Sequence, residues 1–443
     1  MHLVSYWVLF MLLEDYMKRT ITDLSARGLR VLVRVDFNVP HKGNVITDDN
    51  RIKAAVPTIA HLLRQNAKVI LMSHLGKISW KKLAKGEKTV EDIEKEMQKN
   101  DLYIVLEPLK KYLEKALGRN VIIKFSSHTK GEELADIVDG LNDGEVLLVQ
   151  NTRFEVGEEK NDPKLADEWE SLFDAYVMDA FGSAHRAHAS TEGVPARMYL
   201  HNKPTAVGFL VEKELSALSR CVHCRPNERP YIAILGGSKV STKIEVIDSL
   251  LKKCDKILIG GGMTYTFKKA INPDYTVGDS LFEPDQVEYA KKCYATGKIV
   301  LPVDTVCAKG LDFDNLDKPA DEIKLIGNEG GIPAGFQGVD IGKSTREIYA
   351  SEIGKAKTIF WNGPMGVFES EDFDDGTKAV ALACADATKR GVFTVIGGGD
   401  SAAAAKKFGL EKDFSHVSTG GGASLELIQN SGHLPGIDVI EDK

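Results

Sequence analysis

The sequence predicts an α/β protein made of two doubly wound parallel-sheet domains joined by a hinge helix. Its 443 residues exceed the ~100 to 200 that one domain usually contains. Short runs rich in Val and Ile recur along the chain, and most are continuously apolar, as strands buried on both faces of a parallel sheet are. Helix-like segments separate these runs, and the repeated order of strand, helix and strand is typical of doubly wound sheets.

The first half of the chain contains five expected strands and one clear helix. The strands are expected at 30–37, 68–73, 121–125, 145–151 and 175–181. The apolar spacing of 51–66 predicts a helix between the first two strands. Residues 80–101 are densely charged, and although Val90, Ile93 and Met97 could form one weak helical face, we expect a solvated loop insertion.

The second half contains six expected strands, too many to share one sheet with the first five. They are expected at 231–237, 256–262, 298–304, 358–364, 392–399 and 416–422. The patterns of 243–254 and 377–391 predict helices, and Gly391 is a stop signal for the second. The apolar spacing of 207–221 predicts a further helix before the proline-bearing CRPNERP, and we place the join between two Rossmann-like domains there.

The overall composition excludes several classes of protein. Apolar residues make up 43% and charged residues 27%, which is typical of globular proteins rather than disordered or membrane ones. A net charge of -7 argues against a broad nucleic-acid-binding surface, so an anionic ligand must be held by a local basic cluster. The six cysteines are too sparse for a disulfide scaffold, which favours a reducing, cytoplasmic setting. Cys221 and Cys224 form a CxxC, but without a second CxxC we expect neither a zinc site nor a redox pair.

The N-terminus begins with an apolar run that does not predict a membrane anchor. The run from Leu3 to Leu13 is shorter than the ~20 residues that span a bilayer, so we expect no membrane partner. The segment also lacks the basic start and the cleavage site of a secretory signal. An ordinary polar segment begins at Met17, and we expect translation to start there. Mass spectrometry of the native protein tests this, and a peptide containing Trp7 would contradict it.

Charged side chains follow the expected strands of the first half. They are Arg34, Asp36, Asn38, His74, Arg153, Asp179, His185 and Arg186. Arginine binds carboxylate and phosphate in a bidentate fashion, so several arginines at equivalent strand ends favour a site for a small, highly charged anion. Surface ion pairing would explain any one of them. His185 and His188 near Asp179 could also be read as metal ligands, but the positive charge of Arg186 between them opposes a cation.

Glycine turns dominate the strand ends of the second half, where most of the 40 glycines lie. Glycine allows backbone N–H groups and helix N-termini to approach phosphate oxygens, so this half is suited to a polyphosphate. Lys239 and Lys243 follow the turn GGS, and at i, i+4 we expect them to share one helical face beside that phosphate. Asp400 in GGGDS could reach a Mg²⁺ on the phosphate, directly or through water.

Two other motifs suggest rival readings. Gly397 to Ala402 fits GxGxxA after a strand, so an NAD-dependent dehydrogenase is an alternative, although only one strand follows to complete a dinucleotide site. A non-catalytic module that binds a nucleotide or a sugar phosphate also stays open. GVDIGKST at 338–345 nearly matches the P-loop GxxxxGK[ST], but it is one residue short and the preceding GGIPAGFQ does not read as a buried strand.

The motifs taken together resemble one enzyme family. In chain order they are RVDFNVP, SHLG, NTRF, DAFGSAHRAHAS, ILGGSKVSTKI, IGGGMTYTF, WNGPMGVFE, VIGGGDSAAA and STGGGASLELI. From about residue 17 onward they resemble phosphoglycerate kinase. The resemblance implies reversible phosphoryl transfer between 1,3-bisphosphoglycerate and ADP, giving 3-phosphoglycerate and MgATP. It also implies a monomeric enzyme of glycolysis or gluconeogenesis.

The resemblance assigns roles to residues at matching positions. For phosphoglycerate these are Asp36, Asn38, Arg51, His74, Lys77, Arg153 and Arg186. For the nucleotide they are Gly237, Lys239, Lys243, Gly261, Gly338, Val339, Asn362, Glu369, Gly398, Gly399, Asp400 and Ser401. Among them Gly338 and Val339 would contact adenine, Glu369 the ribose, and Asp400 would lie beside the metal. We expect Arg51 and Lys239 to act catalytically, by stabilising the migrating phosphoryl group.

The resemblance also divides the chain. We expect an extra segment at 1–16, an N-terminal phosphoglycerate-binding domain at 17–207, an interdomain helix at 208–221, a C-terminal nucleotide-binding domain at 222–428, and a tail at 429–443 that returns to the N-terminal domain. Because the two substrates would begin on separate domains, we expect hinge closure and direct in-line transfer without a protein nucleophile.

Three features depart from the family pattern. Lys77 stands where the family usually has arginine, which keeps the charge and loses the bidentate fork. Thr242 stands where an acidic residue is common. The third departure is the insertion at 80–101, whose effect the sequence does not predict.

Overall fold

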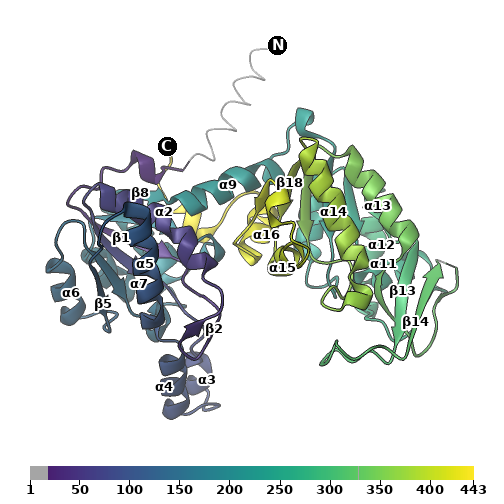
Figure 1. The fold of residues 1–443 in the computed structure, drawn as a ribbon, viewed down its shortest axis with the longest axis horizontal. Helices are drawn as coiled ribbons and strands as arrows, with labels where there is room; N and C mark the ends of the chain where they lie inside the picture. Colours follow the sequence, from purple (N-terminus) through teal and green to yellow (C-terminus); the bar gives the residue numbers. More distant parts are fainter. Residues whose placement is uncertain (1–17, 328) are drawn as a thin grey trace. The chain divides into compact units, whose positions relative to one another are not determined.

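The computed structural model describes residues 18–327 and 329–443, so the expected extra segment at 1–16 lies outside the described residues. Internal contacts divide the chain into two compact units. Unit 1 comprises the chain up to Leu215 together with His433–Lys443, and unit 2 comprises Ser216–Gly432. Figure 1 labels the helices and strands of both.

Unit 1 is built on a six-stranded parallel sheet with the order β5-β6-β4-β1-β7-β8. Its strands are β1 (Arg30–Val35), β4 (Lys68–Met72), β5 (Ile123–Ser126), β6 (Val146–Val149), β7 (Ala175–Asp179) and β8 (Thr205–Val207). The first five confirm the predicted runs, and β8 is an addition. Central β1 is buried on both faces, which is why its sequence RVLVRV does not alternate.

The helices of unit 1 bury apolar faces against this sheet. They are α2 (Asn50–Arg64), α5 (Leu106–Leu117), α6 (Glu132–Asp139), α7 (Pro163–Ser171), α8 (Val194–Leu200) and the short α17 (Pro435–Asp438). Ile52, Ile59 and Leu63 of α2 join Val33 of β1 in one core cluster. A two-stranded hairpin, β2 (His41–Lys42) with β3 (Val45–Ile46), lies between β1 and α2 in the chain.

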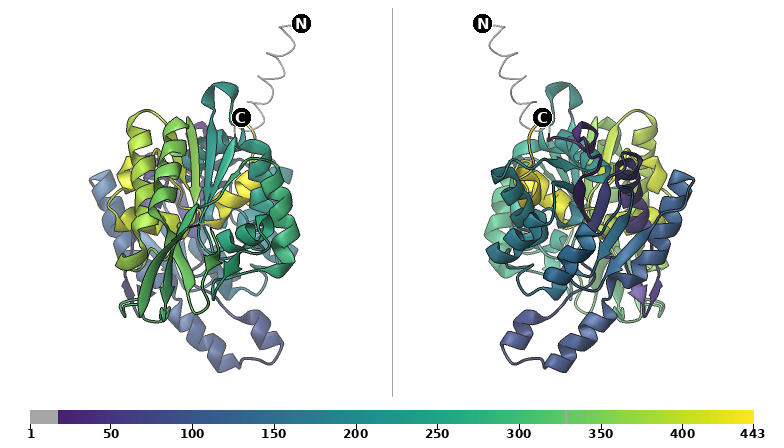
Figure 2. Two further views of the ribbon diagram at one scale, coloured as in Figure 1. Left: turned by 90° about the vertical axis from the view of Figure 1, so that its right-hand side faces the viewer. Right: turned by 90° about the vertical axis from the view of Figure 1, so that its left-hand side faces the viewer.

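The predicted loop insertion at 80–101 is wrong, because this segment folds into two helices, α3 (Trp80–Ala84) and α4 (Val90–Lys99). Figure 2 shows them side by side as a hairpin projecting from unit 1. Thr89 and Asp92 form a capping box at the start of α4, with the Asp92 amide donating to Thr89 Oγ1 at 3.2 Å. Ile93 is buried, with 2% of its surface exposed. The helix therefore depends on its cap and one apolar contact, which the dense charge obscured.

Unit 2 contains a second six-stranded parallel sheet, with the order β12-β10-β9-β17-β18-β19. Its strands are β9 (Tyr231–Leu235), β10 (Lys256–Ile259), β12 (Ile299–Val300), β17 (Thr358–Asn362), β18 (Phe393–Ile396) and β19 (His416–Val417). They confirm the six predicted runs, although several are shorter than predicted. The helices are α10 (Ile244–Lys253), α11 (Met263–Ile271), α12 (Val287–Ala295), α13 (Lys343–Lys355), α14 (Asp375–Lys389), α15 (Gly399–Lys407) and α16 (Gly422–Gln429).

Unit 2 also carries smaller sheets that the sequence analysis missed. Antiparallel β14 (Glu322–Gly327), β13 (Asp304–Lys309) and β16 (Gln337–Ile341) form one, and β11 (Thr276–Val277) pairs with β15 (Gly331–Ile332) in another. The strand β16 covers the first residues of GVDIGKST and leads directly into α13, whereas the preceding GGIPAGFQ contains only the two-residue β15 and the first residue of β16. The spacing of that motif still fails, and β16 runs antiparallel to its neighbour β13 rather than in a parallel sheet.

The helix predicted over 207–221 is α9 (Phe209–Val222), and the boundary between the two units falls within it. Side chains from unit 1 satisfy its first amide groups. Thr58 Oγ1 accepts from the Phe209 amide at 3.0 Å, and Asp179 Oδ1 accepts from the Leu210 amide at 3.0 Å. Both contacts are a form of N-terminal capping by residues distant in sequence.

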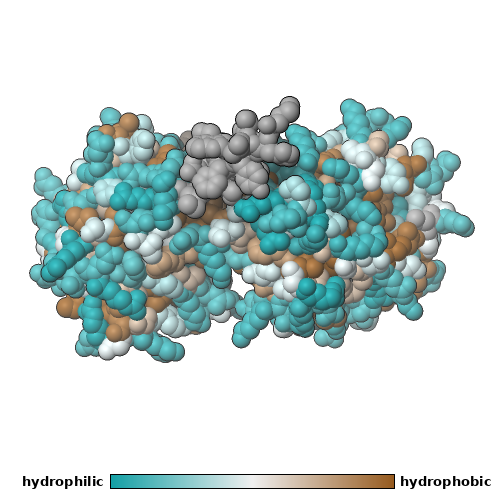
Figure 3. Space-filling view, turned by 90° about the horizontal axis from the view of Figure 1, so that it is seen from above, coloured by the Kyte–Doolittle hydropathy of each residue, from teal (hydrophilic) through white to brown (hydrophobic). Residues whose placement is uncertain are grey.

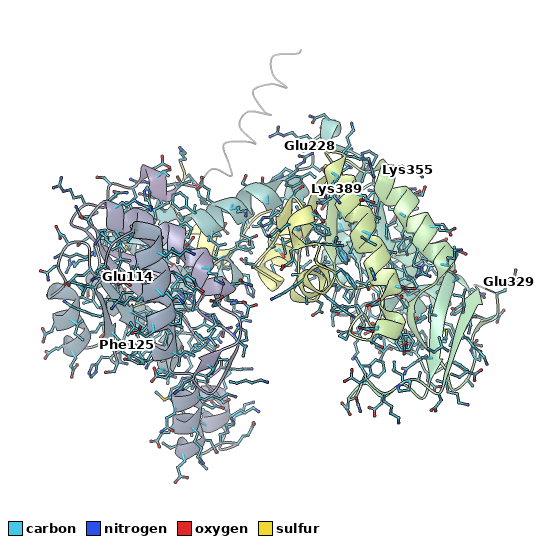
Figure 4. All side chains as sticks on the ribbon, viewed as in Figure 1. Glu114, Phe125, Glu228, Glu329, Lys355 and Lys389 are labelled. Atoms are coloured by element: carbon cyan, nitrogen blue, oxygen red, sulfur yellow. The ribbon has the colours of Figure 1, made fainter. Side chains whose placement is uncertain are left out.

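One face of the described surface is mainly polar. Figure 3 shows hydrophilic residues over most of the face it presents, with hydrophobic residues scattered among them. At the edge of the first sheet, Phe125 of β5, labelled in Figure 4, packs edge-on against Tyr103 with ring centroids 5.1 Å apart. Among the described residues, none of the helices has the length and apolar character needed to cross a bilayer.

Candidate functional site

Unit 1 has a polar cavity of about 160 Å³ at the carboxyl ends of its central strands. Its lining consists of Asp36, Asn38, Arg51, His74, Arg153, Gly182, Ser183, Arg186 and His188. Six of the seven side chains predicted for this half therefore lie together, because the carboxyl ends of parallel strands meet at one edge of the sheet. The exception is Lys77, which is exposed and lies outside the lining.

Asp36 organises the side of the cavity that β1 and α2 provide. Its Oδ2 pairs with Arg51 Nη1 at 2.5 Å, and its Oδ1 accepts from the Asn38 amide at 3.2 Å. Asn38 Oδ1 in turn accepts from the Gly76 amide at 2.8 Å. Arg51 lies in the first turn of α2, so a carboxylate orients its guanidinium beside a helix N-terminus.

Arg34, which we expected among the anion-facing side chains, lies behind the cavity and is 1% exposed. Its Nε donates to Ser190 Oγ at 2.8 Å, and its Nη2 lies 3.2 Å from His74 Nδ1. Ser190 Oγ donates to buried Glu158 at 2.5 Å. Ser190 and Glu158 could not be found from the sequence, because only tertiary packing joins them to Arg34.

This contact determines the form of His74. A guanidinium can only donate, so Nδ1 of His74 is the acceptor and the geometry assigns the proton of the neutral ring to Nε2. Burial, together with the charges of Arg34, Arg153 and Arg51, lowers the pKa of His74 well below 6.5. Burial, together with the charges of Arg34, Arg153 and Arg186, lowers the pKa of His188 to about 3. Both rings face the cavity as neutral groups.

Arg153 enters the cavity from the turn after β6. It is 8% exposed, its Nη1 donates to the Gly76 carbonyl at 2.6 Å, and its Nε lies 3.1 Å from Glu159 Oε1. Arg186 is exposed at the rim, where its Nε donates to His185 Nε2 at 3.2 Å. Three arginines therefore line a small space in which one carboxylate, Asp36, opposes their charge.

Asp179 is the last residue of β7, as its predicted strand-end position requires, but it does not line this cavity. Its side chain is fully buried beneath the start of α9, and burial raises its pKa to about 7. Within residues 18–327 and 329–443, His, Cys, Asp and Glu side chains form no group of three that could hold a metal ion.

In unit 2, three loops converge at the carboxyl ends of β9, β17 and β18. Lys243 Nζ donates to Asn362 Oδ1 at 2.5 Å, and Asn362 Nδ2 donates to the Gly397 carbonyl at 2.5 Å. The Gly363 amide donates to Ser401 Oγ at 2.5 Å. These contacts join the turns after all three strands.

Glycine is required where these loops touch. Gly398 has φ +101°, and a Cβ there would lie 2.4 Å from Asn362 Nδ2. Gly261 has φ +70°, and a Cβ there would lie 2.6 Å from the Gly237 carbonyl oxygen. Both positions would be strained and crowded with any side chain, so backbone groups are left facing the space above the sheet.

The two lysines after GGS do not share a helical face as predicted. The helix α10 begins only at Ile244, so Lys243 occupies its N-cap and Lys239 lies in the preceding loop. Lys239 is exposed, whereas Lys243 is largely buried, and that burial lowers its pKa to about 8 while Asp400 opposes the shift. Asp400 itself is exposed in the first turn of α15.

The remaining predicted residues of unit 2 lie on β16 and after β17. The Gly338 amide donates to Ser280 Oγ at 2.9 Å, and a Cβ at Gly338 would lie 1.8 Å from the Tyr265 hydroxyl oxygen. Val339 is buried, and its carbonyl accepts from the Val367 amide at 2.8 Å. Glu369 is exposed.

Comparisons with known proteins point to one family. The family model described as phosphoglycerate kinase matches residues 21–431. The phosphoglycerate kinase of Fervidobacterium nodosum is 48% identical over 431 residues, which cover 96% of this chain and 99% of the relative. That of Clostridium perfringens is 47% identical over 434 residues, 97% of this chain and all of the relative. The solved structure of phosphoglycerate kinase from Coxiella burnetii has a TM-score of 0.76 and 35% identity, covering 95% of this chain and 98% of that one.

Proposed function

The chain belongs to the phosphoglycerate kinase family, and on that premise we propose that the cavity of unit 1 binds phosphoglycerate and the glycine loops of unit 2 bind ADP or ATP. The family makes it a phosphotransferase of glycolysis, and the dehydrogenase and binding-module alternatives have no support. The observation that carries the assignment of the cavity is the convergence of three arginines on one small space.

The cavity side chains divide into direct contacts and positioning groups. Arg51, Arg153 and Arg186 bind the phosphate and carboxylate oxygens of phosphoglycerate through charge-assisted hydrogen bonds. Neutral His74 adds a donor at Nε2. Asp36 and Asn38 hold Arg51 and the 74–77 loop in place. Lys77 is exposed, so its contact with phosphoglycerate is limited to long-range attraction in this arrangement.

The nucleotide is held by backbone and side-chain groups of unit 2. The turns at Gly237, Gly261 and Gly398–Ser401, together with Lys243 and Asn362, surround the phosphates. Gly338 and Val339 contact adenine, and Glu369 accepts from the ribose.

The residues present also fit a Mg²⁺ ion beside the nucleotide phosphates. The exposed carboxylate of Asp400, in the first turn of α15, is an oxygen ligand of the kind that Mg²⁺ takes in addition to water and substrate phosphates. Bound Mg²⁺ neutralises phosphate charge during transfer.

Transfer itself needs positioning and charge neutralisation rather than a protein nucleophile. We assign the stabilisation of the migrating phosphoryl group to Arg51 on the phosphoglycerate side and to Lys239 on the nucleotide side. Because different units hold the substrates, closure about α9 is the motion that we propose for in-line transfer. The domain limits at 17–207, 208–221, 222–428 and 429–443 belong to the same proposal.

A coupled assay tests this function. Purified protein with ADP and 1,3-bisphosphoglycerate should form ATP, and omission of Mg²⁺ should abolish the reaction. No turnover in either direction, combined with retained nucleotide binding, would contradict the proposal. We also propose a monomer in the cytoplasm, and light scattering of the purified protein together with cell fractionation tests both statements.

A further inference from the structure

We propose that the α3–α4 hairpin, the insertion at 80–101, is part of the phosphoglycerate-binding apparatus, with Trp80 and Asn100 at its two ends acting as positioning residues. The proposal rests on the assigned role of Arg153 in phosphoglycerate binding. Neither Trp80 nor Asn100 lines the cavity. Each instead contacts the main chain of a segment that does.

Trp80 fixes the backbone from which Arg153 projects. Its indole Nε1 donates to the Arg153 carbonyl at 2.8 Å. The guanidinium of the same arginine donates to the Gly76 carbonyl at 2.6 Å. Arg153 is therefore held at both ends, by the hairpin at its main chain and by the 74–77 loop at its side chain.

Asn100 fixes the 74–77 loop from the other end of the hairpin. Its Nδ2 donates to the Glu96 carbonyl at 2.8 Å and reaches the Lys77 carbonyl at 3.4 Å. The main-chain carbonyl of Asn100 accepts from Asn151 Nδ2 at 3.0 Å. Asn151 Nδ2 also donates to the Leu75 carbonyl at 2.7 Å. The hairpin, the loop and the turn before Arg153 thus share one network of hydrogen bonds.

Gly76 shows how closely this network fits. It has φ +61°, and a Cβ there would lie 2.0 Å from Asn100 Oδ1. Its amide donates to Oδ1 of the cavity residue Asn38 at 2.8 Å. The loop therefore passes between Asn100 on one side and a cavity side chain on the other, so a shift of the hairpin displaces cavity residues.

The hairpin has internal contacts that make it a stiff support. Glu96 of α4 accepts from the amide of Ser79 at 2.7 Å and from its hydroxyl at 2.9 Å, and it also pairs with Lys88. Ile78 and Ile93 are buried at 4% and 2% exposure. Since bidentate recognition by arginine depends on placement within a fraction of an ångström, a fixed support for Arg153 favours phosphoglycerate affinity.

The test compares two tryptophan variants in the full-length protein. Trp80→Phe keeps an aromatic ring but removes the pyrrole part of the indole with its N–H, and it should raise the KM for 3-phosphoglycerate by about 3- to 10-fold. The KM for MgATP and kcat should change by less than about twofold, since the proposal leaves unit 2 untouched. Trp169→Phe is the matched control, because Trp169 Nε1 makes the same kind of bond, to the Thr129 carbonyl at 2.7 Å, away from the cavity lining.

Trp169→Phe should leave the KM for 3-phosphoglycerate unchanged even if it lowers the melting temperature. Asn100→Asp is the second variant: it keeps the shape, replaces the amide donor with an acceptor, and should raise the same KM selectively. Unchanged KM values in both hairpin variants, or equal rises for both substrates, would overturn the proposal. Calorimetric binding of 3-phosphoglycerate to the wild type separates the two failures, because absent binding there would contradict the proposed function instead.

Discussion

Arg34 and His74 illustrate how one buried contact sets the chemistry of a side chain that faces the cavity. Arg34 donates toward Nδ1 of His74, so the proton of the neutral imidazole lies on Nε2. Two further buried groups, Ser190 and Glu158, hold the guanidinium itself. The tautomer of His74 in the cavity is therefore set by a chain of buried contacts behind it.

The first prediction concerns the charge of these histidines. Because burial and nearby arginines lower the pKa of His74 well below 6.5 and that of His188 to about 3, neither ring should show a titration step near pH 6.5. Carbon-detected NMR of the imidazole groups, assigned with His74→Gln and His188→Gln, measures this. A titration step near pH 6.5 for either ring would contradict the assigned geometry.

These two pKa values also affect stability. Unfolding releases both rings to a pKa near 6.5, so below that pH the unfolded state binds more protons than the folded state. The contribution of the two neutral rings to the free energy of unfolding is therefore fully present above about pH 6.5. It is lost as the pH falls toward their lowered pKa values.

The second prediction concerns Lys239. Lys239→Ala should lower kcat by about 100- to 1000-fold if its ammonium stabilises the migrating phosphoryl group. The affinity for 3-phosphoglycerate should stay within about twofold, because Lys239 belongs to the other unit. Lys252→Ala, which removes an exposed lysine of α10, is the matched control. Unchanged turnover of the Lys239 variant would refute its role.

The third prediction concerns Asp340 on β16. Burial raises its pKa to about 7, while its Oδ2 accepts from the Gly376 amide at 2.6 Å. Because the pKa of Asp340 is raised in the folded state, this carboxyl group contributes fully to the free energy of unfolding below about pH 3.8. That contribution is lost as the pH rises through 7. Asp340→Asn cannot titrate, so the melting temperature of the variant relative to wild type should increase from pH 5 to pH 8. Calorimetry at the two pH values measures this, and a constant difference would contradict the raised pKa.

At the scale of elements, the C-terminal tail shows how a short segment can complete a domain. The residues His433–Lys443 belong to unit 1. The Gly436 amide of α17 donates to the Ala184 carbonyl at 2.9 Å, and the Glu441 amide donates to Thr205 Oγ1 at 2.9 Å. Ala184 lies between the cavity residues Ser183 and Arg186, so the tail supports one wall of the cavity.

The fourth prediction is that deletion of 429–443 impairs turnover more than nucleotide binding. The deletion removes the support of Ala184 and the ion pair between Arg19 and Glu441 at 2.5 Å, both within unit 1, and from unit 2 it removes only the four residues from Gln429 to Gly432. Turnover and the affinity for 3-phosphoglycerate should both fall, while the Kd for ADP, measured by calorimetry, should stay within about twofold. Removal of Lys443 alone is the control. A proportional loss of ADP affinity would contradict the prediction.

At the scale of the whole molecule, the distribution of charge matters more for anion binding than the net charge does. The chain carries a net charge of -7, yet both substrates are anions. The local excess of arginine in the cavity of unit 1 reconciles the two facts, because a recessed basic cluster attracts an anion despite the overall sign.

The fifth prediction follows from this arrangement. Raising KCl from about 0.05 to 0.5 M shortens the Debye length severalfold, so the KM for 3-phosphoglycerate should rise by roughly 3- to 10-fold. Steady-state kinetics at fixed Mg²⁺ measure the change, and sucrose at equal osmolality is the control. A KM that is independent of salt would show that the arginines act only through close contacts.

The sequence by itself determined the two sheets and most of the cavity. Strands buried on both faces must be continuously apolar, so the Val and Ile runs are visible without any knowledge of their partners. The carboxyl ends of such strands converge, which brings Asp36, His74 and Arg153 together once the strands are recognised. The order of the motifs identified the family because each motif consists of a strand end and the turn after it, which local sequence is enough to recognise.

Only the tertiary structure decided what depends on partners far away in the chain. The burial of Arg34 requires Ser190 and Glu158, and the positions of Lys239 in a loop and Lys243 at the N-cap of α10 depend on how the loop after β9 packs. The α3–α4 hairpin depends on caps and a few apolar contacts that dense charge conceals. Such features arise from packing between segments distant in the chain, and from the balance between the cost of desolvating a charged side chain and the gain from pairing it. Residue types and their spacing do not reveal either.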